Sequence, residues 1–114
     1  MSVELSAADT GTRRTIQVGA RVTVRLAETP TTGYRWQADD DPGLRLVDDR
    51  FEGAEVPRGA GGVRVLDFEA VRSGPARLRL AKRRAWGETE PVEEYLVDLE
   101  VQPADRQPGP AQPQ

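Results

Sequence analysis

The sequence predicts an all-β protein, an immunoglobulin-like antiparallel β-sandwich of about seven to eight strands. Three observations indicate this class. Apolar residues alternate with polar residues at a period of two, turn-forming residues separate the alternating runs at short intervals, and no window has a helical stripe. Short strands at this spacing are typical of two antiparallel sheets packed face to face.

Four runs show the clearest alternation, each with one wet face and one apolar face. They lie at residues 21–26, 63–71, 77–80 and 92–101. Their inward-facing positions, which form the predicted core, are Val22, Val24, Leu26, Leu66, Phe68, Ala70, Leu78, Leu80, Tyr95, Val97, Leu99 and Val101. Trp36 lies in a weaker run beside Tyr34 and is also expected in the core.

Weaker strands are expected at residues 15–18, 34–37 and 44–47, with a short one near Phe51 and an N-terminal edge piece at residues 3–5. The domain is predicted to span residues 1–102. Residues 103–114 contain four prolines and no apolar anchor, so no burial would offset the entropy lost on ordering them. They are predicted to form a disordered Pro-rich C-terminal tail.

The composition excludes several classes of function. There is no Cys and no His, so the usual nucleophile, general base and metal ligands are missing, and we expect no enzyme, no metal and no cofactor. The acidic runs at residues 39–41 and 48–49 lack the spacing of a calcium loop and are predicted to be solvated turns. A net charge of −3 gives no basic field for nucleic acid.

The same sequence predicts where the chain is found. It contains no apolar stretch of about 18 residues and no visible secretory signal, so we expect no membrane association and a cytoplasmic location. The protein would be secreted if its numbering begins after processing. We expect a monomer.

Three loops stand out between the strands. The first, ETPTTGYRW at residues 28–36, contains Pro30, which fixes φ, and Gly33, which allows a positive φ, around the small hydroxyls of Thr31 and Thr32. The second ends in GAGG at residues 59–62, where missing Cβ atoms let another backbone approach closely. Taken on their residues alone, the first segment is better explained as an ordinary turn and the second as a flexible Gly-rich hairpin, with no binding role.

The third loop begins with Arg84, Ala85 and Trp86 at the end of a strand. Trp together with Arg is typical of interface anchors, although a Trp that caps the end of the core is the alternative. In an immunoglobulin-like sandwich, the three loops can gather at one end and form a composite binding edge.

With these loops the sequence resembles the chagasin family of cysteine protease inhibitors, whose three loops carry NPTTGY, GxGG and RPW. Residues 29–34 match the first motif in five of six positions, residues 59–62 match the second fully, and residues 84–86 match the third in two of three. The order and approximate spacing also agree, and the similarity covers roughly residues 15–101.

The resemblance implies reversible, non-covalent inhibition of papain-like cysteine peptidases by occlusion of the active-site cleft. It implies that residues 30–32 cover the catalytic Cys–His pair, that residues 59–62 lie along the non-primed side, and that Arg84 and Trp86 contact the primed side. The implied protease-binding residues are Thr29, Pro30, Thr31, Thr32, Gly33, Tyr34, Gly59, Ala60, Gly61, Gly62, Arg84, Ala85 and Trp86.

The sequence departs from the family pattern at three positions. Thr29 replaces Asn, which tolerates left-handed backbone better, and Ala85 replaces Pro, which would fix φ. Lys82 stands where the family usually has an aromatic residue. The alternative function is that of an immunoglobulin-like module that binds another protein or a ligand with the same loop edge.

Overall fold

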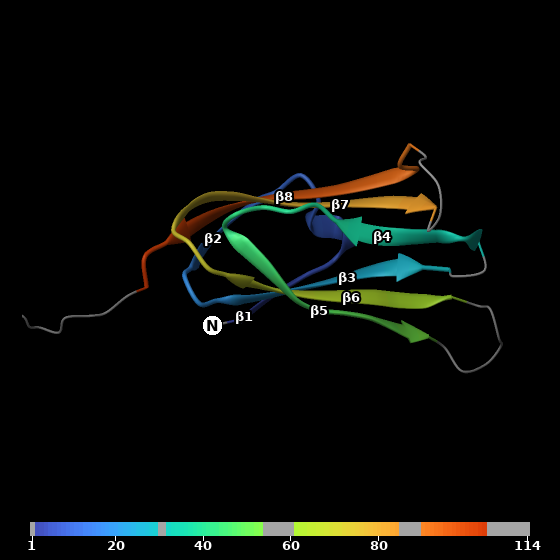
Figure 1. Ribbon diagram of the computed structural model, residues 1–114, viewed down its shortest axis with the longest axis horizontal. Coiled ribbons are helices and arrows are strands. Elements are labelled where there is room, and N and C mark those ends of the chain that lie inside the picture. The colour runs from blue at the N-terminus through green and yellow to red at the C-terminus, as the bar shows by residue number, and fades with distance from the viewer. Residues whose placement is uncertain (1, 30–31, 54–60, 85–89, 105–114) are drawn as a thin grey trace, which may run out of the picture.

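The computed structural model describes residues 2–29, 32–53, 61–84 and 90–104. These residues form eight strands in two four-stranded sheets that pack face to face, which confirms the predicted all-β sandwich (Figure 1). One sheet has the order β1 (Ser2–Leu5), β3 (Arg21–Glu28), β6 (Gly62–Ala70) and β5 (Leu44–Gly53). The other has the order β2 (Arg13–Gln17), β8 (Glu93–Gln102), β7 (Gly74–Arg84) and β4 (Tyr34–Ala38). A 3-10 turn, η1 (Ala7–Asp9), lies between β1 and β2.

The two sheets enclose one apolar core. Every inward-facing residue predicted from the alternation is buried, and so is Trp36, which is 2% exposed. The phenol of Tyr95 places its one polar atom at the rim of this core, where the hydroxyl donates a 2.8 Å hydrogen bond to the carbonyl of Ser6. This bond ties β8 of one sheet to the segment that follows β1 of the other.

The two N-terminal strands pair in parallel, β1 with β3 and β2 with β8, whereas the other four strand pairs are antiparallel. Strands that pair in parallel cannot be joined by a tight hairpin. Here β1 and β2 follow one another in the chain but lie at the edges of different sheets. Alternation reports which face of a strand is buried and not the direction of its neighbour, so the sequence did not indicate these parallel pairs.

The segment predicted as two strands, at residues 44–47 and near Phe51, is one strand, β5. Its register against β6 shifts between Leu46 and Asp48, where a bulge adds one residue to β5. An added residue reverses the alternation, and β5 is an edge strand with much of its length exposed. The sequence pattern therefore looked interrupted although the strand continues.

β8 ends at Gln102, and Pro103 and Ala104 follow it as exposed residues outside any strand. The remaining residues of the predicted tail, 105–114, lie outside the described part of the chain, so the tail stays a prediction. Among the described residues there is no helix of the length and apolarity that a membrane span requires.

Candidate functional site

The strand ends that flank the three loops lie at the same end of the sandwich (Figure 1). Across one sheet, Gly62 at the start of β6 pairs with Glu28 at the end of β3 and with Gly53 at the end of β5. Across the other sheet, Tyr34 at the start of β4 pairs with Arg84 at the end of β7. Of the predicted site residues, the described ones are Thr29, Thr32, Gly33, Tyr34, Gly61, Gly62 and Arg84, whereas Pro30, Thr31, Gly59, Ala60, Ala85 and Trp86 lie outside the described residues.

The first loop is closed by short-range hydrogen bonds. The carbonyl of Thr29 accepts from the N–H of Thr32 at 3.0 Å and from its hydroxyl at 2.7 Å. The Thr32 hydroxyl also accepts from the N–H of Tyr34 at 3.3 Å, and Gly33 has a φ of +84°. No described non-glycine residue has a positive φ, so Thr29 does not need the left-handed tolerance of the Asn that it replaces.

The second loop ends on two glycines that are packed against the chain itself. A Cβ on Gly61, whose φ is +94°, would lie 2.9 Å from the Thr29 hydroxyl and 3.2 Å from the carbonyl oxygen of Glu28. A Cβ on Gly62 would lie 2.3 Å from the carbonyl oxygen of Glu52. The close backbone approach that the sequence suggested at these two glycines is therefore intramolecular, and it brings the second loop against the first.

The third loop is tied to the first through its Arg. The guanidinium of Arg84 lies 5.2 Å from the ring centroid of Tyr34, in cation–π contact. One step further into the sandwich, the ammonium of Lys82 lies 5.4 Å from the ring of Trp36. Lys82 thus contacts an aromatic ring at the position where the family usually has an aromatic residue.

Glu28 closes the base of the first loop from inside the sandwich. Its carboxylate accepts from the backbone N–H of Trp36 at 2.8 Å, and the Trp36 indole donates to the carbonyl of Ala27 at 3.0 Å. β4 pairs only with β7, so this N–H belongs to an edge strand and needs a partner outside the sheet. The two bonds hold together the strands that enter and leave the loop.

The same carboxylate forms a buried ion pair with Arg64. One oxygen of Glu28 accepts from Nε of Arg64 at 3.0 Å and from an Nη at 2.7 Å, while the other Nη donates to Asp49 at 3.1 Å. Glu28 is 2% exposed and Arg64 is 8% exposed. Burial by itself would lower the pKa of Arg64, but the hydrogen bonds and charge of Glu28, and then of Asp49, raise it, so Arg64 stays ionised.

Neither member of this pair was identified from the sequence, although the signal was present. The inward-facing series that ends at Leu26 reaches Glu28 after two residues, and the series that begins at Leu66 reaches Arg64 two residues earlier. Opposite charges at the two core-facing ends of neighbouring strands indicate a buried pair. Asp49, predicted to belong to a solvated turn, instead lies on β5 and contacts Arg64.

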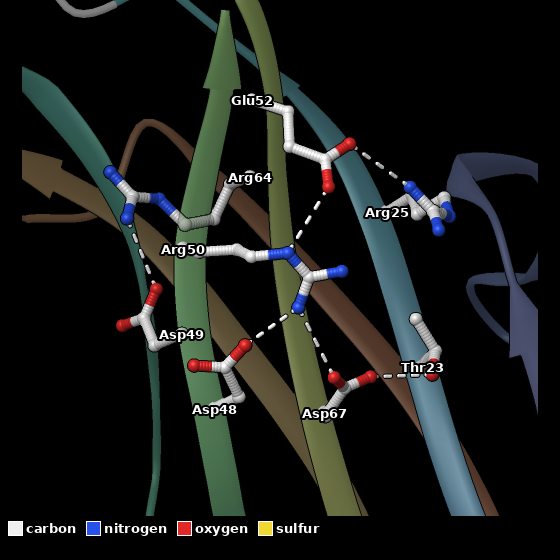
Figure 2. A network of polar contacts seen from close by, with 8 residues as sticks. All are labelled: Thr23, Arg25, Asp48, Asp49, Arg50, Glu52, Arg64 and Asp67. Carbon is white, nitrogen blue, oxygen red and sulfur yellow. Dashed lines mark hydrogen bonds and ion pairs between the residues drawn. The ribbon is translucent and has the colours of Figure 1, made fainter.

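A second ionic network covers the outer face of the same sheet (Figure 2). The guanidinium of Arg50 donates to Asp48 at 2.6 Å, to Glu52 at 3.1 Å and to Asp67 at 3.3 Å. Val65 is fully buried although it faces outward, and its partners in the neighbouring strands are Arg25 and Arg50, a residue type whose aliphatic stem covers apolar surface. This network is a property of the sheet and lies on the opposite face from Arg64 and Asp49.

The remaining acidic run, residues 39–41, contacts its own turn and strand β7. Asp39 pairs with Arg79 at 2.6 Å, and the Asp41 carboxylate accepts from the backbone N–H groups of Gly43 and Arg77. The part of the chain that the structure describes contains no group of acidic side chains arranged to bind a metal ion. A hollow of about 390 Å³ beside Arg77 and Asp98 lies away from the loop end.

Several solved structures share this fold. The cysteine protease inhibitor EhICP2 from Entamoeba histolytica superposes with a TM-score of 0.78 at 19% identity, over 89% of this chain and 96% of that chain. The solution structure of amebosin gives a TM-score of 0.75 at 25% identity, over 90% of this chain and 99% of that one. PbICP-C, solved in complex with falcipain-2, gives 0.59 at 13% identity, over 89% and 98%. No curated protein matches the chain in sequence.

The solved structures establish the fold class, and a family match assigns the chain to a group of inhibitors. The family model described as Chagasin family peptidase inhibitor I42 matches residues 15–101, which is most of the chain. The chain therefore belongs to the chagasin family of cysteine peptidase inhibitors. This membership confirms the resemblance seen in the three motifs, and it places the protein among inhibitors and not among enzymes.

Proposed function

We propose that this protein inhibits papain-like cysteine peptidases reversibly and without a covalent bond, by inserting its three loops into the active-site cleft. The observation that carries the proposal is the contact of all three motifs at one end of the sandwich. Thr29 of the first loop meets Gly61 of the second, and Tyr34 of the first meets Arg84 of the third. PbICP-C, which shares the fold, was solved in complex with falcipain-2.

The roles of the loop residues follow from their chemistry. Pro30 lowers the entropy lost on docking, and the side chains of Thr31 and Thr32 carry no electrophile for the catalytic Cys to attack, which agrees with inhibition without a covalent bond. Gly59 and Ala60 let the second loop run beside the cleft, and Trp86 supplies apolar area on the primed side. Three loops are enough for an interface of standard size, about 800 Å² per partner.

Inhibition of papain by the purified chain tests the proposal directly. We expect competitive inhibition, with full recovery of peptidase activity after dilution because no bond is formed. Absence of inhibition of papain and of a cathepsin L-like enzyme at micromolar concentration would exclude this function. The cytoplasmic location expected from the sequence stays a prediction.

A variant at Trp86 tests whether this residue anchors the peptidase or caps the core of the domain. Trp86→Ala should weaken inhibition by about tenfold or more, because truncation of a Trp anchor removes a large part of the buried apolar area. The midpoint of thermal unfolding should stay close to that of the wild type. If the domain loses its stability together with inhibition, Trp86 caps the core and does not anchor the peptidase.

The second candidate function, a module that binds another protein or a ligand with the same edge, is favoured by one observation. Ala85 replaces the Pro of the third motif, which removes a restriction on φ next to the proposed anchor. If the purified protein is folded but binds no papain-like peptidase, this second function would be supported.

A further inference from the structure

We propose that Glu28 and Arg64 are positioning residues, which lock the first and second loops into one preformed wedge. Neither residue is needed to touch the peptidase. The inference rests on the proposed function for its inhibition assay, but its physical content, the coupling of two loops by a buried ion pair, can be measured on the free protein.

The location of the pair supports a role beyond holding the sheets together. Glu28 is the last residue of β3, directly before the first loop, and Arg64 is the third residue of β6, two residues after the second motif ends at Gly62. The rest of the buried interior is apolar except for this pair, within the residues that the structure describes. The only buried charges among the described residues therefore lie at the end that carries the predicted site.

The hydrogen bonds of Glu28 give it two separate functions. One carboxylate oxygen accepts from Trp36 and closes the base of the first loop, whereas the other accepts both bonds from Arg64 and reaches the second loop. A planar guanidinium that donates two bonds fixes orientation as well as distance. Thr29 directly follows Glu28 in the chain, and Gly61 packs against Thr29, so a shift in the pair would move the two loops relative to each other.

A buried ion pair of this kind is expected to contribute more to the orientation of the groups around it than to the free energy of unfolding. Replacement of both members of a buried ion pair by well-packed hydrophobic residues of similar volume is often neutral for stability, whereas removal of one member is strongly destabilising. Asp49, whose carboxylate is partly exposed, does not need Arg64 in order to be solvated. A neutral pair can therefore restore the fold without restoring the orientation of the loops.

Four variants test the proposal. Glu28→Gln keeps an oxygen for the Trp36 N–H but loses the charge that Arg64 needs, and Arg64→Met keeps the length of the side chain without its donors. The Glu28→Gln/Arg64→Met double variant has a neutral pair. Val101 lies in the core near the C-terminal end of β8, away from the loop end of the sandwich. Val101→Ala is therefore the control for a simple loss of stability.

We expect each single variant to lower both the midpoint of thermal unfolding and the association rate constant with papain, the latter by roughly tenfold if the docking geometry falls to about a tenth of the population. The double variant should recover most of the thermal stability while its association rate constant stays low. Val101→Ala should lose stability and keep the wild-type association rate. Recovery of association together with stability in the double variant would overturn the proposal.

NMR relaxation of the free protein separates this outcome from a failure of the proposed function. In Arg64→Met, the backbone order parameters of Thr32 and Gly33 in the first loop should fall, although the substitution lies on β6, and in Val101→Ala they should not change. If the wild type does not inhibit papain, these order parameters still decide the inference. Unchanged order parameters in Arg64→Met would show that the two loops are not coupled through the pair.

Discussion

Gly61 offers the sharpest test of the loop arrangement, because two different costs of adding a Cβ can be separated there. Its φ of +94° is a conformation that residues with a Cβ adopt at a cost of about 1–2 kcal/mol. In addition, the new Cβ would lie 2.9 Å from the Thr29 hydroxyl, which must rotate or shift. Crowding of this kind costs a further 1–3 kcal/mol, roughly. Gly61→Ala should therefore destabilise the domain by about 2–5 kcal/mol.

Gly19 provides a matched control within the same chain. It also has a φ of +94°, but a Cβ there would meet nothing within 4 Å, and it lies in the turn between β2 and β3. Gly19→Ala therefore measures the backbone cost alone, about 1–2 kcal/mol. Thermal unfolding of the two variants gives the difference, since about 1 kcal/mol shifts the midpoint by roughly 4–8 °C in a domain of this size.

The inhibition assay then connects stability with the site. Gly61→Ala should weaken inhibition of papain, because the first loop has to move away from the second, and Gly19→Ala should not. Removal of the Thr29 hydroxyl in a Thr29→Ala/Gly61→Ala double variant should recover part of the lost stability. Equal destabilisation by Gly61→Ala and Gly19→Ala, with no recovery in the double variant, would refute the contact between the two loops.

Two predictions concern the dependence of stability on pH. Burial, and then the charge of Asp9, raises the pKa of Tyr95 to about 12, so the folded phenol stays protonated while the unfolded one ionises near 10. The contribution of Tyr95 to the free energy of unfolding is therefore fully present below about pH 10 and is lost as the pH rises toward 12. Urea unfolding should show a loss of about 2 kcal/mol at pH 11.5, and Tyr95→Phe should not show this loss. Burial raises the pKa of Asp67, but the hydrogen bond from Thr23 and the contacts of Arg50 outweigh it and leave the pKa below its usual value. The ionised carboxylate therefore stabilises the fold above about pH 4, and the difference in unfolding free energy between wild type and Asp67→Asn should narrow as the pH falls toward about 2; a constant difference would show that Asp67 is not linked to folding.

The strands were predictable because their signal is local. A run such as Val22, Val24 and Leu26 reports its buried face without knowledge of its neighbours, and the same holds for the run of β8. Sheet order, the parallel edge pairs and the bulge in β5 depend on which strand lies alongside, and alternation does not encode that. The prediction therefore identified the faces and missed part of the pairing.

The candidate site was predictable to a different degree. The gathering of the three motifs at one end of the sandwich was predictable, because turn residues and interface residues are recognisable by type, and the binding role of that end stays a prediction. The ion pair beneath the three motifs was missed because Glu and Arg are usually exposed. The apolar series of β3 and β6 were therefore expected to stop before Glu28 and Arg64. Alternation alone, continued by one step at Leu26 and at Leu66, would have placed Glu28 and Arg64 inside.

The placement of the two motif glycines changes what the GxGG motif means in this chain. If glycine were needed only for contact with a peptidase, Gly61 and Gly62 would tolerate a Cβ in the free protein. Both positions are instead closed by the chain's own atoms, the Thr29 hydroxyl at one and the carbonyl of Glu52 at the other. The same two glycines are therefore needed both to fold this end of the sandwich and to form the predicted binding edge. A substitution at either glycine should therefore change the arrangement of the loops in the free protein, before a peptidase binds.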